Sequence, residues 1–252
     1  MNVETLIQTG LAQLGQAGRV PENAAALLAR YGELLVEKNR VMNLTAITQP
    51  RDVATLHMLD CAALLNCAGF EGKTLIDVGT GAGFPGVPLA ALVPSLTVTL
   101  LDALNKRVDW LGETCKALGL DNTRAVHGRA EEAGREPDLR EAFDFAAARA
   151  VADLRVLAEL CLPFVKVGGW FLAMKGTDCG AELEQALPTI QALGGGRRSP
   201  LITPSPTPRW PTGWCGSKKL GLPRLNTPGG GLKYRRRGRK KPPDCAERRP
   251  FL

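Results

Sequence analysis

The chain has 252 residues, of which 44% are hydrophobic, and a formal net charge of +7. This length can bury one sizeable core, with or without a small appended domain. The charge is uneven, because residues 197–252 hold 15 Lys and Arg against two acids, whereas residues 1–196 hold 17 basic and 23 acidic residues. The net charge is therefore no argument for nucleic-acid binding by the first 196 residues.

The composition also argues against several other classes of protein. The seven cysteines are scattered and contain no Cys-x-x-Cys pair, and with only two histidines we expect neither a disulfide framework nor a bound metal. The first residues lack the basic flank and apolar run of a signal peptide, and no apolar stretch approaches the roughly 20 residues of a membrane span. We expect a cytoplasmic monomer without a membrane partner.

Residues 1–66 predict a helical N-terminal extension. Apolar residues recur at helical spacing from Ala24 to Val41 behind Pro21, a residue type that favours helix starts. A second helical run covers about Val53 to Leu65.

Residues 67–196 change to short β-rich runs that alternate with helical stretches. This alternation predicts an α/β fold with a doubly wound, Rossmann-like parallel sheet covered on both faces. The strands are expected at 74–78, 97–101, 123–127, 143–148 and 170–174, and the helices at about 86–92, 106–118, 154–163 and 181–192.

Residues 197–252 form a basic tail rich in Pro, Gly and Arg, with 10 of the 18 prolines. The tail has neither helical nor strand periodicity, so we predict that it is disordered and that the final strands of the sheet are missing or replaced. One hypothesis is a reading frame lost near residues 194–198, which would impair activity. The competing interpretation is a genuine basic RNA-binding arm.

The strand at 74–78 runs directly into a turn that contains Gly79, Gly81 and Gly83. In an open parallel sheet, ligands bind beyond the carboxyl ends of the strands, and glycine lets the backbone approach them closely. A tight turn without any ligand is the alternative. Two acids, Asp102 and Asp77, favour a ligand. Asp102, 21 positions after Gly81, is placed to accept from ribose hydroxyls, although it could instead cap a helix.

Asp77, directly before the turn, favours a cationic ligand over a dianionic pyrophosphate, so the sulfonium of S-adenosylmethionine fits better than NAD. The alternative is an NAD-dependent dehydrogenase, because residues 81–86 also spell the dinucleotide pattern G-x-G-x-x-G. Pro85 and Pro88 speak against it, since they disturb the helix start that would hold a pyrophosphate.

Five stretches carry a resemblance to a known family: Asn43–Thr45, His57–Asp60, Asp77–Gly86, Leu101–Val108 and Ala148–Val151. In order and spacing they resemble the RsmG family, also called glucose-inhibited division protein B. The resemblance covers about residues 20–194. It implies a class I methyltransferase that uses S-adenosylmethionine to methylate nitrogen 7 of one guanine, position 527 by convention, in the 16S rRNA of the small ribosomal subunit.

The resemblance further implies that Gly79, Phe84, Ala130, Glu131 and Arg149 line the cofactor site, beside Asp77, Gly81 and Asp102. From the residues alone, Ala130 and Glu131 could simply start a helix, Arg149 could form a structural ion pair, and Phe84 could be a core aromatic.

Methylation of guanine nitrogen 7 uses a free lone pair and releases no proton, so we assign no catalytic acid, base or nucleophile. Alignment of the two reacting groups would carry the reaction. The candidate RNA contacts, each with a solvated surface charge or a structural histidine as its alternative, are Lys106, Arg107, Arg129, Lys175 and His57. An inactive methyltransferase fold that only binds RNA is a further alternative.

Overall fold

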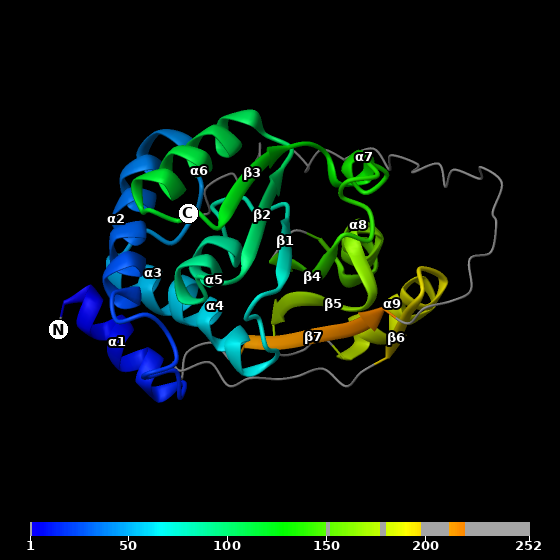
Figure 1. Ribbon diagram of the computed structural model, residues 1–252, viewed down its shortest axis with the longest axis horizontal. Helices are drawn as coiled ribbons and strands as arrows, with labels where there is room; N and C mark the ends of the chain where they lie inside the picture. The colour runs from blue at the N-terminus through cyan, green and yellow to red at the C-terminus, as the bar shows by residue number, and fades with distance from the viewer. Residues whose placement is uncertain (1, 150–151, 177–179, 198–211, 220–252) are drawn as a thin grey trace, which may run out of the picture. The chain divides into compact units, whose positions relative to one another are not determined.

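The computed structural model describes residues 2–149, 152–176, 180–197 and 212–219. All of them belong to one compact unit, Met1–Gly221; the second unit, Leu222–Leu252, lies outside the described residues. The prediction of a disordered tail therefore concerns residues that are mostly outside the described part of the chain. The described residues form seven strands in one sheet (Figure 1).

The strands are ordered β3-β2-β1-β4-β5-β7-β6 across the sheet. The first five are parallel to one another, and β7 runs antiparallel to both β5 and β6. This confirms the predicted doubly wound α/β sheet. The strand bounds are β1 Thr74–Val78, β2 Thr97–Asp102, β3 Thr123–His127, β4 Phe143–Arg149, β5 Val165–Gly176, β6 Gly195–Arg197 and β7 Thr212–Lys219.

Helices cover both faces of this sheet, as its short apolar strands require. Leu75 of β1 packs into one hydrophobic cluster and its neighbour Ile76 into the other, since successive side chains of a strand point to opposite faces. The first cluster contains α1 Val3–Gln13, α2 Ala24–Met42, α5 Gly86–Leu92 and α6 Asn105–Ala117, and the second contains α7 Ala130–Ala133, α8 Leu154–Cys161, the 3₁₀ turn η3 Leu162–Phe164 and α9 Gly180–Ala192 (Figure 1).

The helical extension packs into the same cluster as α5 and α6. Its first helix, α1, was missed by the sequence interpretation, although Asn2 caps it by accepting a hydrogen bond from the Thr5 amide. The second predicted helix is broken into four turns with different hydrogen bonding: α3 Pro50–Val53, the π-helical η1 Ala54–Leu59, α4 Asp60–Ala62 and the 3₁₀ turn η2 Ala63–Asn66.

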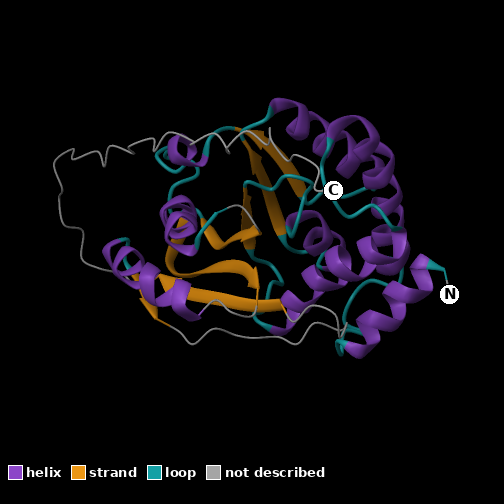
Figure 2. Cartoon of the chain, turned by 180° about the vertical axis from the view of Figure 1, so that it is seen from behind, coloured by secondary structure: helices purple, strands orange, loops and turns teal. Residues whose placement is uncertain are grey.

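The sequence analysis predicts no strand after residue 197 and final strands that are missing or replaced; the absence of a strand is wrong for residues 212–219, which form β7. Strand β7 pairs with β5 along its length, from Trp170 opposite Lys218 to Gly176 opposite Thr212, and β6 pairs with its other edge (Figure 2). The pairing is made by backbone N–H and C=O groups, which every residue of β7 supplies, including its two glycines and its polar residues. The apolar periodicity that identified the other strands is absent from this segment, so the pattern did not reveal it.

Candidate active site

Residues 79–85, named here the glycine loop, join β1 to α5 at the carboxyl end of the sheet. Gly79, Gly81 and Gly83 all have positive φ, at 68°, 60° and 85°. The amides of Gly79 and Thr80 both donate to the Leu101 carbonyl, at 2.9 and 3.0 Å. These two bonds hold the loop against the end of β2, where Asp102 lies.

Asp102 lies at the end of β2 and braces both the glycine loop and the start of α6. One carboxylate oxygen accepts from the Gly81 amide at 2.9 Å and lies 3.5 Å from the Arg107 guanidinium, while the other accepts from the Leu104 amide at 2.9 Å. Asp102 is not the N-cap of α6, which is Leu104 and has no side-chain cap bond; the carboxylate accepts from the Leu104 amide just before the helix. Because a carboxylate can accept about four hydrogen bonds, Asp102 can still accept from a ligand.

Asp77 faces the interior of the loop. Its Oδ2 accepts from the Thr80 hydroxyl at 2.7 Å and from the Gly86 amide at 2.8 Å, while Oδ1 is buried without a hydrogen-bond partner in the described part of the chain. Burial raises the pKa of this carboxyl to about 6, against the lowering effect of the two hydrogen bonds. A negative charge here is costly, and a nearby cation would favour it.

The two sides of the glycine loop differ in how much space surrounds them. A Cβ on Gly81 would meet only the Gly79 carbonyl, at 3.8 Å, whereas a Cβ on Gly83 would lie 2.7 Å from Val87 and 2.9 Å from Leu111. The Gly83 side is therefore closed by the core. The Gly81 side leaves backbone open to a ligand next to the Asp102 carboxylate, which is the arrangement that a ribose-bearing cofactor requires.

A second group of candidate residues meets at Phe84. The Arg149 guanidinium lies 4.4 Å from the centroid of the Phe84 ring, and the His57 ring lies 4.5 Å from it. His57 is 7% exposed; its Nε2 lies 2.9 Å from the Thr45 hydroxyl and its Nδ1 3.1 Å from the Leu56 carbonyl. Burial, followed by the charge of Arg149, lowers the pKa of His57 to about 3.

These contacts fix the state of His57. A neutral imidazole has one donor and one acceptor, so the Nδ1 proton is donated to the Leu56 carbonyl and Nε2 accepts from Thr45. The ring thus links the Thr45 segment to Phe84 and has no free nitrogen with which to act as a general base.

Ala130 and Glu131 begin the short helix α7, beyond the end of β3. The Gly128 amide donates to the Asp102 carbonyl at 3.0 Å, which brings this turn beside the end of β2. The Glu131 carboxylate accepts from Arg129 at 2.9 Å. Burial would raise the pKa of Glu131, but the hydrogen bonds of its own amide and of Arg129 lower it below its ordinary value.

The remaining candidate cations differ in their surroundings. Lys106 is exposed in the first turn of α6, and Arg107 lies beside Asp102. Lys175, near the end of β5, is only 17% exposed; its ammonium donates to the Ala152 carbonyl at 2.9 Å and pairs with Glu182 at 2.8 Å. Lys175 therefore forms an ion pair that joins β5 to α9, and unlike Lys106 it is not an exposed cation.

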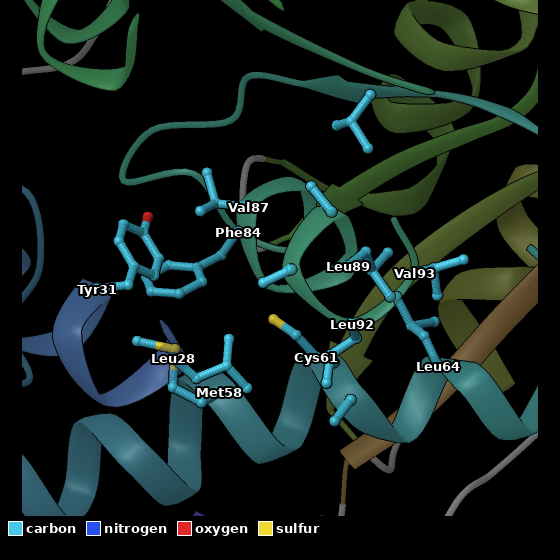
Figure 3. Packing of buried hydrophobic residues seen from close by; sticks show 14 of the residues in the cluster. Leu28, Tyr31, Met58, Cys61, Leu64, Phe84, Val87, Leu89, Leu92 and Val93 are labelled. Atoms are coloured by element: carbon cyan, nitrogen blue, oxygen red, sulfur yellow. The ribbon is translucent and has the colours of Figure 1, made fainter. Parts of the chain in front are cut away.

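Sequence interpretation missed Tyr31, which reaches the glycine loop from α2. Its ring is 1% exposed and packs against Phe84, and its hydroxyl donates to the Ala82 carbonyl (Figure 3). In the sequence, Tyr31 is one apolar member of a helical stripe. Nothing local marks its hydroxyl as a partner of a loop 51 residues away.

The described residues contain no group of three His, Cys, Asp or Glu that could hold a metal ion. Among their helices, none has both the length and the apolar character needed to cross a membrane.

The fold and the site together define a class I S-adenosylmethionine-dependent methyltransferase. The structure resembles a SAM-dependent methyltransferase from Aquifex aeolicus with a TM-score of 0.50 and 21% identity, over 67% of this chain and 93% of that one. It also resembles a protein of Methanococcus maripaludis with a TM-score of 0.54 and 13% identity, over 79% of this chain and 96% of that one. At these identities the likeness shows the fold.

The chain belongs to the rRNA small subunit methyltransferase G family, also called GidB, whose model matches residues 24–199. It is 46% identical over 196 residues to the "Ribosomal RNA small subunit methyltransferase G" of Alkaliphilus metalliredigens, a match that covers 77% of this chain and 81% of that protein. It is 48% identical over 166 residues to the protein of the same name in Clostridium perfringens strain 13, covering 66% and 70%. These findings confirm the family and the cofactor predicted from the sequence.

Proposed function

We propose that this chain transfers a methyl group from S-adenosylmethionine to nitrogen 7 of a guanine in 16S rRNA, position 527 by the family's convention. The observation that carries the proposal is the glycine loop, open at Gly81 and flanked by the Asp102 carboxylate, in a chain that belongs to this family. Relatives named as methyltransferases do not favour the dehydrogenase alternative.

For the cofactor, we propose that Gly79 and Gly81 receive the amino-acid part and that Asp102 accepts from the ribose hydroxyls. The Ala130–Glu131 turn, which lies beside the end of β2, would contact the adenine. Phe84 and Arg149 would close the opposite side. When bound, S-adenosylmethionine supplies an electrophilic methyl group and a positive charge, which Asp77 stabilises from beneath the loop.

The protein's own contribution is alignment. Guanine nitrogen 7 attacks with its lone pair and loses no proton, so no base is needed, in agreement with the neutral, fully bonded state of His57. Holding the two reacting atoms in line can contribute several kcal/mol, up to roughly 7–11 kcal/mol in ideal systems.

For the RNA, we propose contacts from the exposed cations Lys106 and Arg129, which lie at the ends of the strands near the proposed cofactor site, and from the half-buried Arg107 beside Asp102. The base would be presented from a folded loop, because its edge must reach a site at the end of the sheet. We further propose a cytoplasmic monomer in which residues 1–66 form the helical extension and 67–196 the cofactor-binding core.

The test is methyl transfer from radiolabelled S-adenosylmethionine to small subunits and to deproteinised 16S rRNA that lack the modification. Borohydride reduction and aniline cleavage then locate 7-methylguanine. We expect one cleavage site, and its loss in Gly79→Arg. Binding of S-adenosylhomocysteine without any methylation would instead support the inactive RNA-binding alternative, and binding of NAD would support the dehydrogenase.

A further inference from the structure

Tyr31 is the point at which the helical extension contacts the glycine loop through a polar group. Its ring contacts two other aromatic rings, with centroids 6.5 Å from Trp110 and 5.5 Å from Phe84. Its hydroxyl donates to the Ala82 carbonyl, and Figure 3 shows the ring reaching from α2 to the side of Phe84. Burial raises the pKa of Tyr31 well above its ordinary value, so the hydroxyl keeps the proton that it donates.

Gly83 is shaped to receive this hydroxyl. A Cβ on Gly83 would lie 2.5 Å from the Tyr31 oxygen, so the absence of a side chain at Gly83 is what admits the tyrosine. Tyr31 and Gly83 are therefore complementary. Together they fill the closed side of the loop, opposite the open side at Gly81.

Packing alone does not account for the hydroxyl. A phenylalanine would fill nearly the same volume against Trp110 and Phe84, whereas a buried tyrosine hydroxyl requires a partner. Here the partner is a carbonyl of the glycine loop. The hydroxyl thus constrains the backbone of residues 82–84 directly and, through the adjoining ring, the orientation of Phe84.

We propose that Tyr31 is a positioning residue for methyl transfer: from α2 it holds residues 82–84 of the glycine loop in the conformation that receives S-adenosylmethionine. The inference rests on the proposed function for the identity of the ligand. It makes the helical extension a part of the cofactor site, in addition to any contact that the extension makes with RNA.

The test compares Tyr31→Phe with Thr123→Val in the full chain. Thr123 is a matched control, because its hydroxyl also donates to a backbone carbonyl, that of Leu120 at 2.8 Å, but at the start of β3. Hydrogen exchange of peptides covering residues 79–87 is measured without ligand, and binding of S-adenosylhomocysteine is measured by calorimetry. For Tyr31→Phe we expect loop exchange and the dissociation constant each to rise about 5- to 10-fold, the value of one hydrogen bond.

Thr123→Val should leave both quantities unchanged, and in Tyr31→Phe the KM for S-adenosylmethionine should rise by about the same factor as the dissociation constant, a larger change than any fall in kcat. Equal loop exchange in Tyr31→Phe and the unmodified chain would overturn the proposal. If the unmodified chain bound no S-adenosylhomocysteine, the proposed function would fail, and the exchange experiment would still decide whether Tyr31 holds the loop.

Discussion

The guanidinium of Arg149 lies over the face of the Phe84 ring, 4.4 Å from its centroid. Its other neighbours belong to the helical extension: the Leu56 carbonyl at 3.4 Å and the Asp60 carboxylate at 4.0 Å. Phe84, which follows β1, and Arg149, the last residue of β4, are thus joined to η1 and to the first residue of α4 around a single cation. Loss of the guanidinium should therefore affect both the cofactor site and the stability of the chain.

Arg149→Lys should weaken binding of S-adenosylhomocysteine about tenfold and lower the free energy of unfolding by about 1–2 kcal/mol, because a lysine does not stack as a planar guanidinium does. Calorimetry and urea unfolding provide the two measurements. Arg30→Lys is the control, since Arg30 is 61% exposed in a surface pair with Glu33. Equal effects of the two substitutions would remove Arg149 from the site.

Gly83→Ala should lower the free energy of unfolding by about 3 kcal/mol or more, because the new Cβ would overlap Tyr31 and Val87 at a φ of 85°. Gly72→Ala separates the two causes: Gly72 has a φ of 67° and open space around its missing Cβ, so only about 1 kcal/mol is expected. Urea unfolding of both variants measures the difference, and similar losses would mean that backbone conformation alone explains Gly83.

Asp77→Asn should stabilise the folded chain at neutral pH, because it removes a buried negative charge. The folded pKa of about 6 exceeds the ordinary 3.8, so the folded state binds the proton more tightly and loses stability as the pH rises from about 4 through 6. Removing the charge should raise the free energy of unfolding at pH 7.5 by up to about 3 kcal/mol, and by less at pH 5. Urea unfolding at both pH values measures this.

The same variant tests the role of Asp77 toward the sulfonium. An asparagine oxygen can still accept from Thr80 and Gly86, so the loop should keep its shape. S-adenosylmethionine carries the sulfonium charge and S-adenosylhomocysteine does not. We expect the affinity for the first to fall about 3- to 10-fold relative to the second; an unchanged ratio would argue that Asp77 acts only on the loop.

His57 should affect the pH dependence of stability in the opposite sense to Asp77, and His57→Gln tests this. Because the folded pKa of His57 is about 3 against an ordinary 6.5, the unfolded state binds the proton more tightly, and the stabilisation present above pH 6.5 is lost as the pH falls toward 3. Between pH 7.5 and 5 this amounts to about 2 kcal/mol, which His57→Gln should no longer lose. Urea unfolding checks the slope, and an inflection in kcat near pH 6.5 that vanished in His57→Gln would contradict the neutral positioning role.

Lys106→Ala and Lys175→Met should separate RNA contact from structure. Lys106 is exposed beside the cofactor edge, so its loss should weaken RNA binding and reduce the slope of affinity against salt by about one. Lys175 is bonded to Ala152 and Glu182, so its loss should lower stability and leave that slope unchanged. Filter binding across a salt series, beside urea unfolding, distinguishes the two; a reduced slope in Lys175→Met would reverse the assignment.

Local patterns were enough to predict much of this fold. The bounds of β1 and β3, and of α5, agree with the sequence analysis because short apolar runs bounded by turn residues are local signals. Strand β5 begins at Val165, before the predicted start at Trp170. The prediction missed these first residues because they include Gly168 and Gly169, a residue type that is common in turns. Where pairing depends on backbone alone, as in β7, the pattern gave no warning.

The site divides in the same way. The glycine loop and Asp102 follow strand ends and could be predicted from their positions, whereas the contacts of Tyr31, Thr45 and His57 join segments far apart in the sequence. Such contacts are decided by tertiary packing. His57 was a candidate RNA contact, and its burial between Thr45 and Phe84 gives it an interior position that no spacing could reveal.

The antiparallel β7 lies between β5 and β6, although β6 comes earlier in the chain. During synthesis, residues 195–197 therefore leave the ribosome before the strand that separates them from β5 exists. Residues 195–197 can pair with the sheet only after residue 219 has emerged, so the last two strands join the sheet in the reverse of their order in the chain. A nascent chain stopped before residue 212 would present β5 as an open edge, ready to pair with another polypeptide.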